Sequence, residues 1–198
     1  MKLAGRALVL LLIFVCTAFA ETAEIKKIDV YARTIDSLVN KDRNPIVIAD
    51  TADYEKEKPE WKRFASEKEL EKFRETTETY AVAYNFRRNG KLVASNFTKF
   101  SPSGDWAKYL FHYFREDGSL AKVRSELRTF YGDFIVIQDL YFDRKGKQLK
   151  KTVRYLDLTT RKPKKPKKEY LDGLVFSLNE KDYYKHASKL PFAALLSN

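Results

Sequence analysis

The residues that most often perform chemistry in proteins form no familiar catalytic or metal-binding motif in this chain. Its 198 residues contain no H-E-x-x-H, no G-x-S-x-G, no P-loop and no dinucleotide-binding glycine pattern. The two histidines, His112 and His186, lack the spacing of metal ligands, and Cys16 is the single cysteine. We therefore predict no catalytic residue, no metal and no cofactor. An enzyme of unfamiliar type is the least favoured alternative.

Aromatic and cationic residues alternate through the middle of the chain and could bind a ligand. Aromatic rings stack on planar or sugar groups, and neighbouring cations pair with anions. One hypothesis is that these residues form a binding surface for a glycan, an anionic envelope polymer, a peptide or a lipid. The alternative is a solvated sheet face on which Lys and Arg stems lie over the rings. The residues are Tyr109, Phe111, Tyr113, Lys122, Arg124, Tyr141, Lys150 and Arg154.

A short basic segment carries much of the net charge of +11. Because this charge is local, it does not predict an all-over nucleic-acid-binding surface. Prolines between the cations favour an extended, solvated linker. Contact with anionic lipid headgroups or envelope polymers is the alternative. The cations are Arg161, Lys162, Lys164, Lys165, Lys167 and Lys168.

The elements that position these residues are indicated by glycines at intervals of 14 residues, namely Gly90, Gly104, Gly118, Gly132 and Gly146. Asx-Gly-type turns alternate with Gly-Asp turns, so the full period is 28 residues. Asn-Gly and Asp-Gly between strand-like runs are strong hairpin signals. The pattern predicts six antiparallel strands at about 77–87, 91–100, 106–115, 119–129, 134–143 and 147–157.

Two-residue Asx-Gly turns would define which side chains share a face of the sheet. One face is mostly apolar, and we expect it to be the core beneath the helices, with His112 as a core histidine opposite Val123. The predicted binding residues lie on the opposite face, toward solvent. Cross-strand pairs on the apolar face are Phe86 with Val93, Phe114 with Ala121, and Phe142 with Leu149.

Helical and irregular segments flank this meander. Apolar spacing predicts a helix over 23–40, and Ser66 with Glu69 forms a capping box for a helix ending at Arg74. A short strand over 46–49 is an open alternative, 53–61 is expected to be a loop, and a helix is predicted from Asn179 to Lys189. The fold class is α+β, with helices packed on one face of a six-stranded or slightly larger meander. The parts are a helical region 23–75, the meander 76–157, the basic linker 158–168 and a C-terminal helical segment 169–198, in a single domain 21–198.

Residues 1–20 are typical of a secretory signal peptide. Lys2 and Arg6 precede an apolar run, and Ala18-Phe19-Ala20 matches a cleavage site. We expect cleavage after Ala20, no transmembrane anchor in the mature chain, and a periplasmic or extracellular location. Acylation of Cys16 as a lipoprotein is the alternative.

The hairpins resemble two families of repeat proteins. The run Gly104-Asp105-Trp106 followed by 113–120 is similar to the hairpin units of MORN-variant repeat proteins. Residues 141–146 are similar to a YD-type repeat of secreted bacterial shell proteins. Both resemblances cover only 84–157, and both families have periods shorter than 28 residues. The resemblance implies a structural or interaction role and transfers no catalytic residue.

These observations together predict an exported, non-enzymatic cell-envelope protein that binds or scaffolds through a sheet face. The alternative is a periplasmic carrier of an apolar or lipid ligand in a curved half-barrel. A closed apolar cavity would favour the carrier, and acids converging on His112 would favour an enzyme. The binding surface would be favoured by a flat sheet that exposes Tyr109, Phe111, Tyr113, Arg124 and Arg154.

Overall fold

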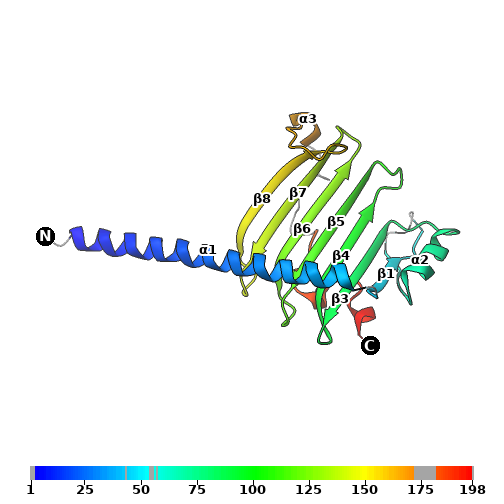
Figure 1. The fold of residues 1–198 in the computed structure, drawn as a ribbon, viewed down its shortest axis with the longest axis horizontal. Coiled ribbons are helices and arrows are strands. Elements are labelled where there is room, and N and C mark those ends of the chain that lie inside the picture. Colours follow the sequence, from blue (N-terminus) through cyan, green and yellow to red (C-terminus); the bar gives the residue numbers. More distant parts are fainter. Residues whose placement is uncertain (1–2, 43, 54–55, 57, 172–181, 198) are drawn as a thin grey trace.

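An eight-stranded antiparallel sheet forms the body of the protein (Figure 1). The structure is a computed structural model that describes residues 3–42, 44–53, 56, 58–171 and 182–197. The fold is α+β, but the sheet has eight strands in the order β2-β1-β3-β4-β5-β6-β7-β8, not six. The strands are β1 Ile46–Asp50, β2 Trp61–Phe64, β3 Ala81–Arg88, β4 Lys91–Phe100, β5 Trp106–Phe114, β6 Leu120–Thr129, β7 Phe134–Phe142 and β8 Gln148–Asp157.

The six predicted strands are β3 to β8, and the repeated glycines lie at their turns. All five repeated glycines have φ between 75° and 84°, the left-handed conformation that residues with a Cβ rarely adopt. The two additional strands extend the sheet beyond β3. The 46–49 alternative is correct, since β1 pairs with β3, and β2 begins at the end of the predicted 53–61 loop. Strand β2 was not predicted because its four residues are too few to show an alternating pattern.

β-Bulges change the register beside each Asx-Gly turn. In the first hairpin the shift lies between Phe86 and Arg87, so Phe86 pairs with Ala94 and not with Val93 as predicted. This shift moves Phe86 to the face that carries Tyr113. Bulges also replace the predicted partners of Phe114 and Phe142, which pair with Leu120 and Gln148. Away from the bulges, the predicted pairs hold in the second and third hairpins, including His112 with Val123.

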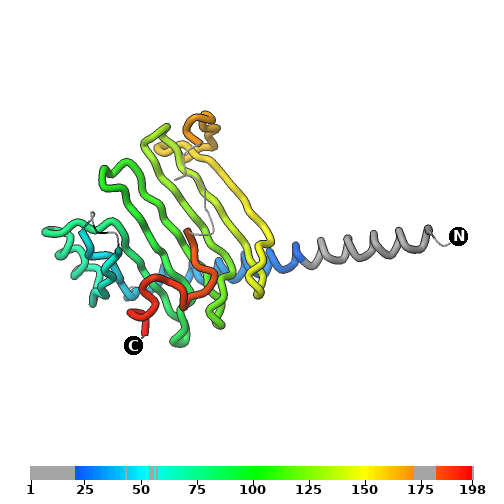
Figure 2. Tube along the Cα trace, turned by 180° about the vertical axis from the view of Figure 1, so that it is seen from behind, coloured from blue at the N-terminus to red at the C-terminus, as the bar shows by residue number. Residues whose placement is uncertain are grey.

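The two faces of the sheet are covered by different parts of the chain (Figures 1 and 2). We call the face that carries Leu110, His112 and Phe114 the core face, and the face that carries Tyr113 and Lys122 the helix face. The C-terminal segment 182–197 packs on the core face, where Phe192 and Leu190 join a cluster with Leu110 and Phe114. Helices α1 (Leu3–Lys41) and α2 (Glu67–Arg74) pack on the helix face. The prediction that all helices share the apolar face is therefore wrong.

Helix α1 is longer than the predicted 23–40 helix and crosses the helix face near the Asx-Gly turns (Figure 1). Its buried residues Ile28, Ala32 and Ile35 recur at helical spacing, which explains why this stripe packs on the sheet. Helix α2 begins as its capping box predicts, because Ser66 Oγ accepts a hydrogen bond from the Glu69 amide at 3.2 Å.

The C-terminal segment differs from the predicted helix between Asn179 and Lys189. Asn179 lies outside the described residues, and the described part contains two short 3₁₀ turns, η2 (Ala187–Lys189) and η3 (Ala193–Leu196). His186 caps η2 by accepting a hydrogen bond from the Ser188 amide at 3.2 Å. A further short helix, α3 (Lys168–Leu171), follows the basic segment.

Candidate functional site

The eight residues predicted to form a binding surface all come from strands β5 to β8, but helix α1 divides them. Tyr113 and Lys122 are only 3% and 5% exposed, and Tyr141 is also buried. These three contact α1 and are not available to a large partner, so the prediction of a fully open face is wrong. The other five remain at least partly exposed on the same face, namely Tyr109, Phe111, Arg124, Lys150 and Arg154.

Two acids of α1 explain why the helix covers this face. The Tyr113 hydroxyl donates to Asp36 Oδ1 at 2.8 Å, and the Tyr141 hydroxyl donates to Asp29 Oδ1 at 2.9 Å. Burial and the charge of Asp36 both raise the pKa of Tyr113. The helix therefore brings carboxylates to a face that is rich in donors, as well as apolar side chains.

Lys122 is the buried cation of this contact. Its Nζ lies 3.0 Å from the Tyr141 hydroxyl and 3.3 Å from Asp29 Oδ1. Burial opposes its charged form, but the hydrogen bond to Tyr141 and the charge of Asp139 outweigh that effect and raise the pKa of Lys122. Lys122 is therefore a charged structural residue beneath α1.

Asp139 is a buried carboxylate that several cations share. Arg124 Nε donates to it at 2.9 Å, Lys122 Nζ lies at 3.5 Å, and Arg154 Nη2 lies at 3.9 Å. The Arg124 and Arg154 side chains are 39% and 56% exposed, so both guanidinium groups also face solvent. A guanidinium has five N–H donors, so a guanidinium that binds one carboxylate still has donors that can bind a further anion.

A cavity of about 440 Å³ lies between α1 and this cluster, lined by Arg33 of the helix and by Thr152 and Arg154 of β8 among others. Farther along the helix face, the Arg128 guanidinium lies 4.7 Å from the centre of the Tyr109 ring. Arg128 and Arg161 also pair with Glu126, at 2.7 and 3.5 Å. We call Arg124, Arg128, Lys150, Arg154 and Arg161 the cationic patch, which includes three of the predicted binding residues.

The basic segment is not an extended linker. Lys164 Nζ donates to the carbonyls of Gly132 and Asp133, at 3.0 and 2.7 Å, and lies 3.2 Å from Asp157 Oδ2. The segment folds back along the end of edge strand β8, where the Asp157 amide donates to Lys162 O. Backbone hydrogen bonds between this segment and β8 outweigh the repulsion among its cations. Lys162, Lys165, Lys167 and Lys168 remain exposed, so their contact with an anionic surface stays a prediction.

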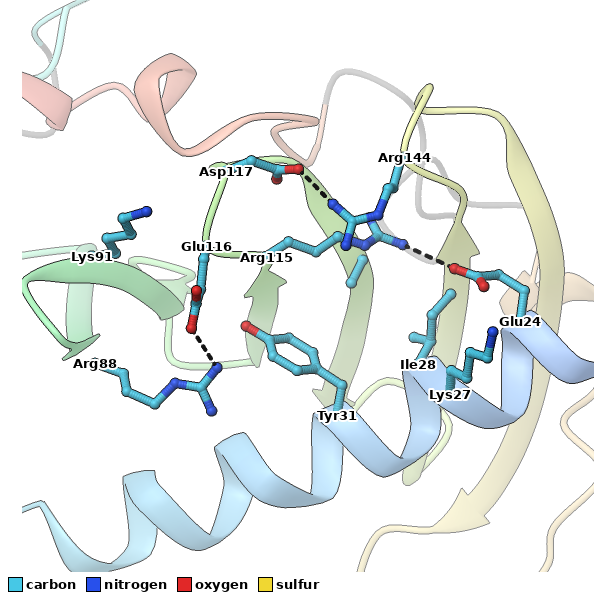
Figure 3. A pocket seen from close by; sticks show the side chains of 11 residues that line it. Glu24, Lys27, Ile28, Tyr31, Arg88, Lys91, Arg115, Glu116, Asp117 and Arg144 are labelled. Atoms are coloured by element: carbon cyan, nitrogen blue, oxygen red, sulfur yellow. Dashed lines mark hydrogen bonds and ion pairs between the residues drawn. The ribbon is translucent and has the colours of Figure 1, made fainter.

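A second cavity, of about 640 Å³, was not predicted from the sequence (Figure 3). It lies where α1 passes the turns at Gly90, Gly118 and Gly146, and its wall includes Arg88, Glu116 and Arg144. Each of these residues stands two positions before its turn glycine. The 28-residue period could therefore have indicated that they meet, since it brings equivalent positions to the same end of the sheet.

Both histidines are bound into the structure. His112 is fully buried, with Nδ1 3.2 Å from Leu110 O and Nε2 accepting a hydrogen bond from the Tyr184 amide at 3.3 Å. Burial lowers the pKa of His112 to about 4, so it is neutral at pH 7. His186 is exposed, and its Nε2 lies 3.1 Å from Asp117 O. In the described part of the chain no acidic side chain is found hydrogen-bonded to His112.

Comparisons of the chain with models of protein families, with curated proteins and with solved structures returned no match. In the described part of the chain, none of the helices combines the length and apolar character needed to cross a bilayer. The same residues contain no cluster of three or more His, Cys, Asp or Glu side chains placed to hold a metal ion.

Proposed function

We propose that this chain is an exported, non-enzymatic protein of the cell envelope that binds an anionic partner through the cationic patch beside α1. The observation that carries the proposal is the arrangement at Asp139. Two partly exposed guanidinium groups, Arg124 and Arg154, share this one buried carboxylate. Their remaining donors face solvent next to Lys150, which lies 5.8 Å from the centre of the Tyr141 ring.

The charge balance supports an anionic partner. The five cations of the patch are accompanied by three acids, namely Glu126, buried Asp139 and Asp36 of α1. Neighbouring Tyr109 and Phe111 are half-buried rings that could contact sugar or lipid groups next to an anion. An anionic envelope polymer carries both features, so we favour it over a peptide. Export is supported by the charged, apolar and small-residue parts of 1–20.

The carrier alternative is less well supported by the geometry. Charged side chains line both the 440 Å³ cavity and the 640 Å³ cavity, whereas an acyl chain needs an apolar enclosure. An enzymatic role has the weakest support, because His112 contacts backbone groups in the core.

Two exposed cations of the cationic patch, Lys150 and Arg154, lie on strand β8 and can be neutralised together. Lys150→Gln/Arg154→Gln removes two exposed cations of the helix face, and we expect it to weaken binding to lipopolysaccharide and peptidoglycan at least tenfold at low salt. Arg124 is left in place because it holds buried Asp139. Co-sedimentation and surface plasmon resonance of the mature chain measure the binding.

The control variant is Lys151→Gln/Lys189→Gln, which makes the same change in net charge away from the helix face. Lys151 follows Lys150 on β8 and pairs with Leu140, so its side chain lies on the core face. The control should bind like the wild type. Equal binding by all three proteins, or equal losses in both variants, would show that the helix face is an inert solvated surface.

A further inference from the structure

The cavity of about 640 Å³ at the Asx-Gly turns has a positively charged wall (Figure 3). Its cations come from α1 and from three successive hairpins, and acids partly balance them. The lining cations are Lys27, Arg88, Lys91, Arg115 and Arg144, and the lining acids are Glu24, Glu116 and Asp117, which leaves a formal charge of +2. A wall with this charge favours a dianion.

The acids are already engaged with individual arginines. Arg88 Nη2 lies 3.1 Å from Glu116 Oε1, and Arg144 Nη1 lies 2.9 Å from Asp117 Oδ2. Asp117 also accepts hydrogen bonds from Ser119, which lower the pKa of this carboxyl. For Lys27 and Lys91, no carboxylate lies within 4.0 Å in the described part of the chain. The excess positive charge therefore comes from these lysines and from Arg115.

Arg115 is a buried cation whose ion pair with Glu24 is long. Its residue is 8% exposed, and its guanidinium donates to two backbone carbonyls, Leu120 O at 2.8 Å and Phe142 O at 2.7 Å. Its nearest described carboxylate, Glu24, is 4.0 Å away. Burial, followed by the charge of Arg144, lowers its pKa. Because buried charges are normally closely paired, an anion in the cavity would add to the weak countercharge of Glu24.

The remaining wall includes a contact between α1 and β5 and a donor without a partner among the described residues. Tyr31 of α1 donates its hydroxyl hydrogen to Phe114 O and so joins the helix to the end of β5. The Arg88 guanidinium lies 5.7 Å from the centre of the Tyr31 ring, and its buried Nε has no hydrogen-bond partner among the described residues. Guanidinium groups in a fixed arrangement suit phosphate, whose oxygens accept several N–H donors at once.

We propose that this cavity binds a phosphomonoester, which carries a charge close to −2 near neutral pH. Phosphate oxygens would face Arg88, Arg144 and the lysines, and the organic group would extend through the open side of the cavity. The inference goes beyond the proposed function, because the cavity lies at the turns and shares no residue with the cationic patch.

The test uses two probes with the same phosphate chemistry, sn-glycerol 3-phosphate in solution and phosphatidylcholine vesicles that contain phosphatidic acid. Binding of each to the mature wild-type chain is measured by titration calorimetry. We expect Lys27→Gln/Lys91→Gln to weaken binding about tenfold or more, because it removes the two cations without a close carboxylate. Thermal unfolding verifies that the variant is folded.

The matched control is Lys26→Gln/Lys147→Gln. Lys26 adjoins Lys27 on α1, and Lys147 stands in the third hairpin where Lys91 stands in the first, yet neither lines the cavity. Binding of the soluble probe identifies a free phosphomonoester as ligand, and binding of vesicles alone identifies a lipid headgroup. Absence of binding to both probes, or equal weakening in the two double variants, overturns the inference whatever the outcome for the cationic patch.

Discussion

His112 illustrates at the scale of one residue how burial decides the role of a titratable group. Its ring lies 5.6 Å from the ring of Phe114, nearly parallel to it, and its nitrogens contact backbone groups of the core. The neutral form satisfies these contacts, with Nδ1 as donor and Nε2 as acceptor. Protonation would place an uncompensated charge in the interior, so the residue couples stability to pH.

We predict that stability falls with decreasing pH more steeply in the wild type than in His112→Gln. The pKa of His112 is about 4 in the folded state, against about 6.5 unfolded. The unfolded chain therefore binds the extra proton first, so the contribution is complete above pH 6.5 and is lost as pH falls toward 4. Full loss corresponds to about 3 kcal/mol. Urea unfolding at pH 7, 5.5 and 4.5 measures the difference, and parallel pH profiles would contradict the assignment.

At the scale of elements, the β5–β6 turn and the C-terminal segment hold each other in place. The Ala187 amide donates to Gly118 O at 2.9 Å, and the Leu120 amide donates to Lys185 O at 3.0 Å. The His186 ring lies directly over the turn, where a Cβ on Gly118 would be 2.7 Å from its Cε1 atom. Gly118 is therefore required both for its left-handed conformation and for this contact.

Gly118→Ala is predicted to be more destabilising than Gly90→Ala. Both glycines have positive φ, so each substitution costs about 1–2 kcal/mol of backbone strain. At Gly90 no atom lies within 4 Å of the added Cβ, whereas at Gly118 the His186 ring must move. Chemical denaturation measures the difference, and adding His186→Ala to both variants should reduce it. Equal losses in the two single variants would show that the ring moves without cost.

At the scale of the whole molecule, the sheet depends on cover from both ends of the chain. Residues 182–197 cover the core face, and α1 covers part of the helix face. Burial of Ile28 and Ile35 contributes about 1.5–3 kcal/mol each, and the contacts of Asp29 and Asp36 add polar complementarity. The buried apolar residues described on α1, namely Ile28, Ala32 and Ile35, lie in the part of the helix that is kept when 1–20 is removed.

Removal of residues 1–20 should therefore leave the free energy of unfolding within about 0.5 kcal/mol of the full chain, whereas removal of 1–41 should cost on the order of 5 kcal/mol or prevent folding. Within the chain that starts at Glu21, Ile35→Ala should cost about 2–5 kcal/mol. Val30→Ala, at an exposed position of the same helix, is the control. Urea titration measures all five proteins, including the full chain, and a small effect of Ile35→Ala would show that α1 is not required on the sheet.

The sequence by itself determined strands β3 to β8, because a turn glycine and its flanking alternation act over a few residues. Gly118 requires a reversal wherever the rest of the chain goes, and His112 shares a face with Leu110 and Phe114 by simple alternation. Turn glycines and alternation do not predict the β-bulge beside Phe86. One extra residue in the strand leaves the turn unchanged but transfers a side chain to the other face of the sheet.

Only the tertiary structure decided which face is covered and where charges meet. Tyr113 pairs with Asp36 across 77 residues, and Lys122 pairs with Asp29 across 93. Local patterns carry no information about such partners, so a face that is half polar could equally have faced water. The choice was made by complementarity between α1 and the sheet, and the same packing placed Arg115 beneath a charged cavity.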